Sequence, residues 1–143
     1  MKPPAPSTSI ANRGFASQQI IEIMREFGRL HFGTTSLSAT IEESLISAAI
    51  VIGMADGKPM TATDIGHYLG YPRPTVIRKL KIVAKHRRLA TVKTGSRVCF
   101  VFEDMDDPKV VSGVAKLMEM ISAMCHQASK LNPSAMDLNQ GDR

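Results

Sequence analysis

The sequence lacks several features that mark specialised protein classes. It has no tryptophan, few aromatic residues and only two cysteines, Cys99 and Cys125, which excludes a disulfide scaffold and predicts two free, packed thiols. The longest apolar run, residues 45–55, is about half of the roughly 20 residues that a membrane span needs. The N-terminal MKPPAPSTS continues into no apolar stretch, so no secretory signal is expected. These absences predict a cytoplasmic protein without a membrane partner.

What the sequence does have is segregated charge. The chain carries 18 Lys and Arg against 13 Asp and Glu. Residues 58–97 hold ten of these bases but only one acid, Asp64, and the rest of the chain is net negative. Charge gathered in this way predicts a polyanionic partner for the middle of the chain. A solvated charged face is the alternative interpretation.

Two helices are predicted in the first third of the chain. An apolar stripe at intervals of three and four residues predicts a helix at residues 17–32, after a flexible arm of residues 1–15. Thr40 and Glu43 then have the spacing of a capping box in front of the apolar run. We therefore expect a second, buried helix that ends at Met54 or Ala55.

Two shorter helices are predicted in the basic segment. Thr61 and Asp64 form a second potential capping box, and Gly70 closes the helix that follows. The next helix opens at Arg73, Pro74 or Thr75, because proline is tolerated in a first helical turn. Its core side is predicted to consist of Val76, Leu80 and Val83. Its outward side is predicted to carry Arg73, Pro74, Ile77, Arg78 and Lys81.

A hairpin and a long helix complete the pattern. Two β-prone runs, residues 89–92 and 98–102, flank a Thr94-Gly95-Ser96 tip that is bordered by Lys93 and Arg97, which is typical of a β-hairpin. A last helix is expected at residues 108–131, with Asp106 and Asp107 at its entry, before a flexible tail of residues 132–143.

The two terminal helices predict a symmetric homodimer. Their apolar stripes are wider than a small helical core can cover, although packing within one subunit would need a similar stripe. The expected interface consists of Ile20, Met24, Phe27, Val114, Leu117, Ile121, Met124 and Ala128. In the last helix Val111, Met118 and Cys125 widen the stripe.

The order of these elements is that of a helix-turn-helix followed by a wing, and a known family shares it. The segments MTATDIGHYLGYPRPTVIRKL and LATVKTGSRVCFVFED resemble the winged helix of the multiple-antibiotic-resistance-regulator (MarR) family of bacterial transcription factors. The resemblance covers about residues 40–103. It implies a mainly α fold with a small antiparallel β wing: a single domain of residues 16–131 with a DNA-binding lobe at 40–103 and dimerisation helices at 16–33 and 108–131. Arg87 and Arg88 depart from the pattern, because the family usually ends its recognition helix with glycine.

The resemblance and the charge pattern together predict a double-stranded DNA-binding surface. Its residues are Arg73, Pro74, Thr75, Ile77, Arg78, Lys79, Lys81, Lys93, Ser96 and Arg97. Arginine can bind guanine O6 and N7, and Ile77 can lie against a thymine methyl group. Lys79, with Lys85, Arg87 and Arg88, suits phosphates, which position a protein without specifying sequence.

The sequence thus predicts a dimeric transcriptional regulator, most simply a repressor, that acts in the cytoplasm. The resemblance also allows a small-molecule effector, which nothing in the sequence names. Two other interpretations stay open: a winged-helix adaptor that binds proteins, and a redox-responsive regulator that uses Cys125. No enzyme motif, cofactor motif or metal spacing among the four histidines is evident.

Overall fold

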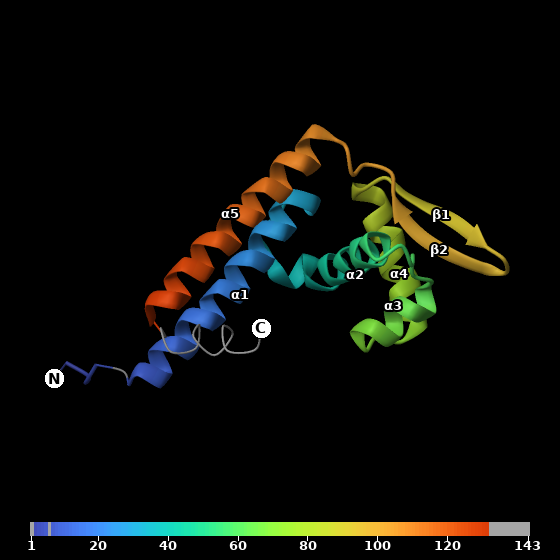
Figure 1. Cartoon of the computed structure of the whole chain (residues 1–143). Helices are drawn as coiled ribbons and strands as arrows, with labels where there is room; N and C mark the ends of the chain where they lie inside the picture. Colours follow the sequence, from blue (N-terminus) through green and yellow to red (C-terminus); the bar gives the residue numbers. More distant parts are fainter. Residues whose placement is uncertain (1, 6, 132–143) are drawn as a thin grey trace, which may run out of the picture. The chain divides into compact units, whose positions relative to one another are not determined.

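The computed structural model describes residues 2–5 and 7–131, so the predicted tail at residues 132–143 lies outside the described residues. The described chain is mainly helical, with one two-stranded antiparallel sheet (Figure 1). It divides into two compact units, one formed by Met24–Gly113 and the other by the described residues on either side of that segment.

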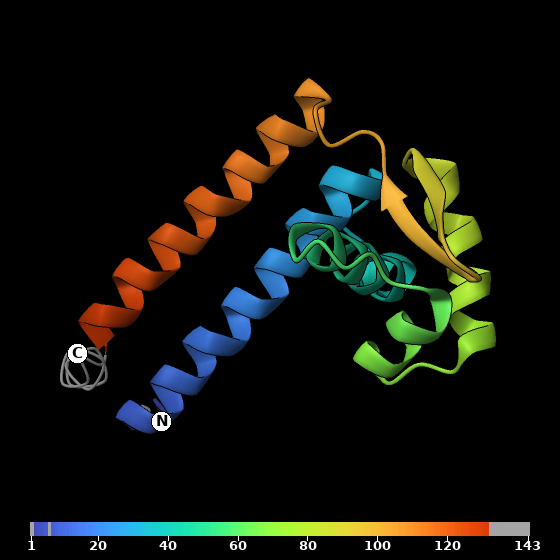
Figure 2. The same ribbon diagram turned by 45° about the vertical axis from the view of Figure 1, so that its right-hand side comes forward.

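The larger unit contains three complete helices and the sheet. Its helices are α2 (Leu37–Ala55), α3 (Ala62–Leu69) and α4 (Arg73–His86), and its strands are β1 (Leu89–Thr94) and β2 (Arg97–Phe102). The end of α1 (Thr8–Phe32) and the start of α5 (Pro108–Leu131) also belong to it. Figure 2 shows α3 and α4 grouped with α2 and the hairpin.

The core of this unit lies where α2, α3 and α4 meet. The buried members of the cluster are Ile46, Ala49, Ile50, Ala62, Ile65, Val76, Leu80, Val83 and Phe102. The prediction that Val76, Leu80 and Val83 face the core is confirmed. Burying a large aliphatic side chain stabilises a protein by about 1.5–3 kcal/mol. This contact is therefore the main source of stability for α4.

Local sequence signals determine α3 and its neighbours. Thr61 caps α3: its side chain accepts a hydrogen bond from the backbone N–H of Asp64, and the Asp64 carboxylate accepts one from the backbone N–H of Thr61. The predicted capping box is therefore confirmed. The helix ends at Gly70, and α4 begins at Arg73 with proline in its first turn, both as predicted.

The hairpin is also as predicted, with longer strands. Leu89 pairs with Phe102 and Thr94 pairs with Arg97, which leaves Gly95 and Ser96 as a two-residue turn. Gly95 has a φ of 65°, a value that glycine adopts without strain. The backbone N–H of Phe100 donates to the Met60 carbonyl at 2.9 Å, so β2 is attached to the segment before α3.

Two helix starts differ from the predictions. Helix α1 begins at Thr8, so residues 8–15 of the expected flexible arm are helical. Helix α2 begins at Leu37 after Ser36, and Thr40 lies buried inside it with its hydroxyl donating to the Ser36 carbonyl at 3.2 Å. The capping box predicted at Thr40 is therefore wrong. Thr40 lies inside the helix, and the Glu43 carboxylate accepts a hydrogen bond from Lys79 instead.

Helix α2 is long and apolar enough to cross a membrane by length and composition alone. The same helix supplies Ile46, Ala49 and Ile50, which are completely buried in the protein core. The burial of these three residues accounts for part of its apolar character.

The close approach of α3 to the turn after it gives a testable prediction. A Cβ atom on Gly66 would lie 2.7 Å from the backbone oxygen of Tyr71. We expect Gly66→Ala to lower the free energy of unfolding by about 1–3 kcal/mol, measured by urea denaturation. Gly14→Ala is the control, because a Cβ at this helical position meets nothing within 4 Å, and it should be neutral or stabilising by up to about 1 kcal/mol. Equal effects of the two changes would contradict this packing.

Candidate nucleic-acid interface

The outward side of α4 presents a group of cations. Because Val76, Leu80 and Val83 are buried, the opposite side of the helix faces solvent. The exposed residues there include Arg73, Pro74, Arg78 and Lys81, all of them on the predicted surface. Within the described part of the chain, no ion pair engages Arg73, Arg78 or Lys81. Their charge is therefore available to a partner.

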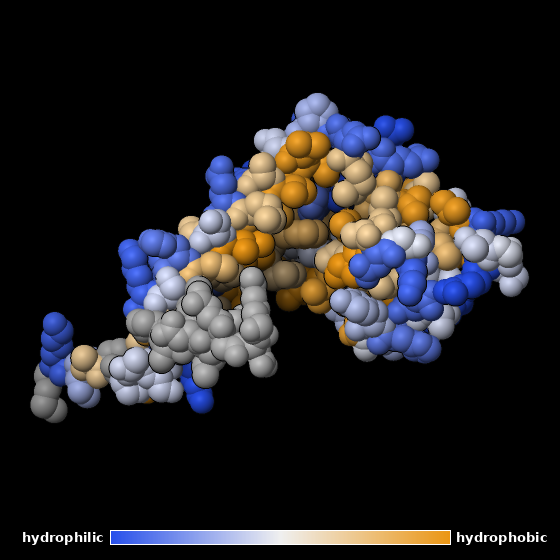
Figure 3. Space-filling model, viewed as in Figure 1, coloured by the Kyte–Doolittle hydropathy of each residue, from blue (hydrophilic) through white to orange (hydrophobic). Residues whose placement is uncertain are grey.

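The hairpin extends this cationic surface. Lys93, Ser96 and Arg97 are exposed at and beside its tip. Arg73, Ile77, Ser96 and Arg97 line one hollow of about 690 Å³, bounded by the start of α3, the start of α4 and β2. Figure 3 shows hydrophilic surface around the hairpin tip. The structure thus brings together predicted residues of α4 and of the hairpin that lie 19–24 positions apart in the sequence.

Arg97 is held in place by an acid on α3. Its guanidinium forms an ion pair with the Asp64 carboxylate, and both side chains remain partly exposed. The pKa of Asp64 is lowered, first by the hydrogen bond from the Thr61 backbone and also by the charge of Arg97. Asp64 therefore has two roles, as the partner of Thr61 in the α3 capping box and as the anchor of the hairpin.

Lys79 does not belong to this surface, contrary to the prediction. Its side chain is only 15% exposed, and its Nζ atom lies 2.8 Å from Glu43 and 3.0 Å from Glu42. The hydrogen bond to Glu43 is the main reason that the pKa of Lys79 is raised, followed by the hydrogen bond to Glu42. The ammonium group therefore joins α4 to α2.

Arg87 is likewise structural, contrary to its expected phosphate contact. Its guanidinium binds Asp104 through two hydrogen bonds, Nε to Oδ2 at 2.7 Å and Nη2 to Oδ1 at 2.8 Å. Both residues are buried, and the guanidinium carbon lies 4.1 Å from the centre of the Phe102 ring. The hydrogen bond from Arg87 holds the pKa of Asp104 below its usual value. The ion pair joins the end of α4 to the segment that leads into α5.

The Arg87 guanidinium also reaches His31 near the end of α1. Nη1 lies 3.0 Å from His31 Nδ1, and because guanidinium groups only donate, Nδ1 must be the unprotonated acceptor. Burial, followed by the charge of Arg87, lowers the pKa of His31 to about 4. His31 is therefore neutral at physiological pH. It belongs to the contact that joins the end of α1 to Arg87 and Asp104, and not to a charged surface.

Ile77 and Thr75 are less exposed than a fully outward position requires. Both are half-buried, and Ile77 packs against the edge of the core. Ile77 also lines a second, apolar hollow of about 340 Å³ between α4 and the sheet, with Leu80, Leu89 and Phe100. The expectation of a freely exposed isoleucine is therefore wrong, although one side of its side chain still lines the hollow near Arg97.

Sequence reasoning missed the start of α3. Thr63 is exposed and lines the same hollow as Arg73 and Arg97. The signal that could have found it is its place in the first turn of a capped helix, where backbone N–H groups point outward.

The expected interface residues of the terminal helices divide into two groups. Ile20, Val114, Ile121 and Ala128 are exposed, whereas Met24, Phe27, Leu117 and Met124 are half-buried. The two cysteines differ in the same way. Cys99 is buried, as expected, but Cys125 is exposed, so the prediction of a packed thiol is wrong for Cys125 within one chain.

The buried Arg87–Asp104 pair predicts a large effect on stability. Removing Arg87 leaves a buried carboxylate without its partner, so Arg87→Ala should lower the free energy of unfolding by about 3–5 kcal/mol. Arg88→Ala is the matched control, because its pair with Glu103 spans 3.9 Å between exposed side chains, and it should change stability by about 0.5 kcal/mol or less. Chemical denaturation at pH 7 measures both, and similar losses would contradict the structural role of Arg87.

The neutral His31 predicts a stability that depends on pH. In the unfolded chain a histidine has a pKa of about 6.5, whereas the folded value is about 4. Between these values the unfolded state binds a proton that the folded state does not, so the free energy of unfolding falls as the pH drops from 6.5 to 4. His31→Asn retains an acceptor without a titrating group and should show a smaller decrease between pH 7 and 4.5 in urea denaturation. An unchanged pH dependence would show that His31 is not its source.

Comparison with known proteins identifies no relative. No protein-family model matches this sequence, and neither a curated protein nor a solved structure matches it.

Proposed function

We propose that this protein is a sequence-specific double-stranded DNA-binding transcriptional regulator, most simply a cytoplasmic repressor that occludes a promoter. In this proposal α2, α3 and α4 form a helix-turn-helix, α4 is the recognition helix, and the hairpin is the wing. The observation that carries it is the exposed, unpaired group Arg73, Arg78 and Lys81 on the side of α4 opposite its buried aliphatics.

The geometry of a DNA duplex suits this arrangement. A major groove about 12 Å wide accepts one α-helix whose outward side chains reach the base edges. Arg73 and Arg78, near the start of α4, are then available for guanine, while Lys81, Lys85 and the hairpin cations are available for phosphates. The wing would approach the backbone with Lys93 and with Arg97, which Asp64 already orients.

A second candidate function has one observation in its favour. The apolar hollow lined by Ile77, Leu80, Leu89 and Phe100 lies between the proposed recognition helix and the wing. Such a hollow could receive an apolar side chain of a protein partner, which is the adaptor interpretation. The adaptor requires no salt-dependent binding to nucleic acid, so the two functions are separable by experiment.

DNA binding is tested by selection from a random duplex library followed by fluorescence anisotropy on the selected site. The affinity of the wild type should fall steeply as salt rises, because phosphate contacts release counterions. Arg78→Ala should lose about 1–3 kcal/mol on the selected site and less on random DNA, whereas Lys85→Ala should weaken both alike.

Lys130→Ala is the matched control, because it removes one exposed cation of α5, outside the proposed DNA-binding lobe. It should leave both affinities unchanged within error. Binding that does not depend on salt, or equal losses for Arg78→Ala and Lys130→Ala, would contradict the proposed function.

A further inference from the structure

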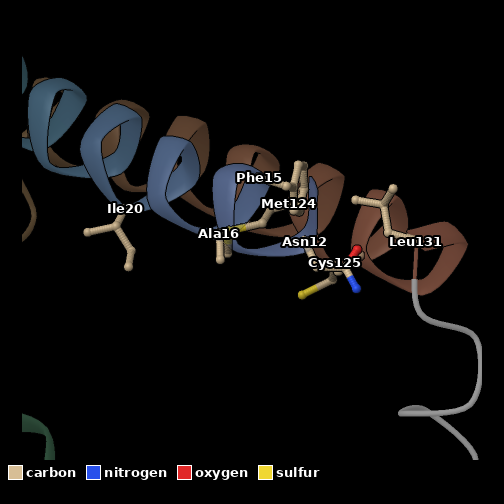
Figure 4. Close-up of a pocket in the computed structure, with 8 residues that line it drawn as sticks. Asn12, Phe15, Ala16, Ile20, Met124, Cys125 and Leu131 are labelled. Atoms are coloured by element: carbon tan, nitrogen blue, oxygen red, sulfur yellow. The ribbon is translucent and has the colours of Figure 1, made fainter. Parts of the chain in front are cut away.

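Apolar hollows lie in both units of the chain. One measures about 360 Å³ and lies between α1 and α5 (Figure 4), among residues that are predicted for the dimer interface, such as Ile20 and Met124. Another measures about 340 Å³ and lies in the larger unit, between α4 and the hairpin. We call the second one the α4–β1 hollow, because most of the residues that line it come from α4 and β1.

The α4–β1 hollow has apolar walls and an open side. Leu80, Leu89 and Phe100 supply the walls. Ala84 on α4 and Thr91 on β1 also line the hollow, and both are exposed. The hollow is therefore open to solvent between the middle of β1 and the second half of α4.

Strand β1 has a free hydrogen-bonding edge beside this hollow. Its one strand partner in the described chain is β2. Thr94 and Arg97 flank a two-residue turn and therefore exchange hydrogen bonds, so Thr91 and Lys93 direct their backbone groups away from β2. The same alternation occurs on β2, where the N–H of Phe100 points outward and donates to the segment before α3. No backbone hydrogen bond from another described element reaches Thr91 or Lys93.

The free edge and the hollow together fit an extended peptide. A strand that pairs with this edge places every second side chain on the face of the sheet that Leu89 and Thr91 present to α4. One of these side chains then lies over the α4–β1 hollow, where Ala84 is too small to exclude it. Backbone pairing at a sheet edge, with alternate side chains in pockets, is an established mode of peptide recognition.

The charges around the hollow determine which kind of peptide fits. Lys81 lines the hollow, Lys85 lies one turn further along α4, and Lys93 is on the same face of β1 as Thr91. All three lysines are exposed, and no ion pair within the described residues engages them. A second copy of the chain would bring the same cations together, and lysines at a sheet edge oppose such self-pairing. An acidic segment of a different protein has the complementary charge.

We propose that β1 binds an extended acidic segment of a partner protein as a third strand. One apolar side chain of the segment fills the α4–β1 hollow, and acidic side chains two positions before and after it meet Lys81 and Lys93. Because both lysines also belong to the proposed DNA-binding surface, the segment and duplex DNA exclude each other. This exclusion rests on the proposed function, whereas the strand addition does not.

The first test uses a defined probe, the labelled heptapeptide Thr-Glu-Thr-Leu-Thr-Glu-Thr with blocked ends. Its leucine and two glutamates lie on one face of an extended strand. Fluorescence anisotropy should show saturable binding to the full chain. Two control peptides, one with lysine in place of both glutamates and one with serine in place of leucine, should each bind about ten-fold more weakly or worse.

Variants of the chain locate the binding site. Ala84→Phe fills the hollow and should weaken binding of the glutamate peptide by about ten-fold or more. Ala55→Phe is the matched control, because Ala55 is exposed at the end of α2 and does not line the hollow, and it should leave the affinity unchanged. Lys93→Glu reverses the sign of one contact, so it should weaken the glutamate peptide and strengthen the lysine peptide.

Strand addition has its own signature in amide hydrogen exchange. The glutamate peptide should slow the exchange of the Thr91 and Lys93 amides, which the added strand engages. The Val92 amide should change less, because Val92 already pairs with Cys99 across the hairpin. Binding through side chains alone would leave all three amides unchanged.

Three results would overturn the strand addition: no saturable binding of the glutamate peptide, equal affinities of Ala84→Phe and the wild type, or unchanged exchange at Thr91 and Lys93. Competition is measured on the selected duplex, whose apparent dissociation constant should rise in proportion to the peptide concentration. A duplex that stays bound beside the peptide would contradict the mutual exclusion. A chain that binds the peptide but no DNA would support the strand addition and contradict only the proposed function.

Discussion

The rotation of α4 about its own axis is the constraint on which the rest of the larger unit depends. Val76, Leu80 and Val83 are buried against α2 and α3, and any other rotation would expose them while burying guanidinium groups. Exposing three aliphatics costs several kcal/mol, and burying unpaired charge costs more. The cations at Arg73 and Arg78 are therefore held outward by the core and not by contacts of their own.

Two further cations of the same segment have a different role. Lys79 and Arg87 are each enclosed by carboxylates, on α2 and before α5 respectively. Ion pairs of this kind add little net stability relative to apolar packing, but they define which elements meet, because an unpaired charge at either place is costly. They set α4 against α2 at its middle and against the base of the hairpin at its end. The cations of the segment thus fall into two groups. Some lie exposed on the outward side of α4, and others form ion pairs that connect α4 to neighbouring elements.

The two units of the chain differ in how far their apolar side chains are buried. The larger unit encloses a core and surrounds it with capped helices and a short hairpin. The smaller unit leaves apolar residues exposed along α5, among them Met118 at 60% and Val114 at 43%.

The sequence by itself determined the elements whose signals are local. The capping box of Thr61 and Asp64, the stop at Gly70, the hairpin turn around Gly95 and the heptad spacing of α5 all act over a few residues, so they are readable without a fold. The homodimer and the DNA-binding surface remain predictions from the same patterns. Only the tertiary structure decided which cations are free. Lys79 meets Glu43 across 36 positions, and Arg87 meets Asp104 and His31 across 17 and 56 positions. Whether a charged side chain binds a partner molecule or a neighbouring helix depends on what the fold brings beside it, and no local pattern contains that information.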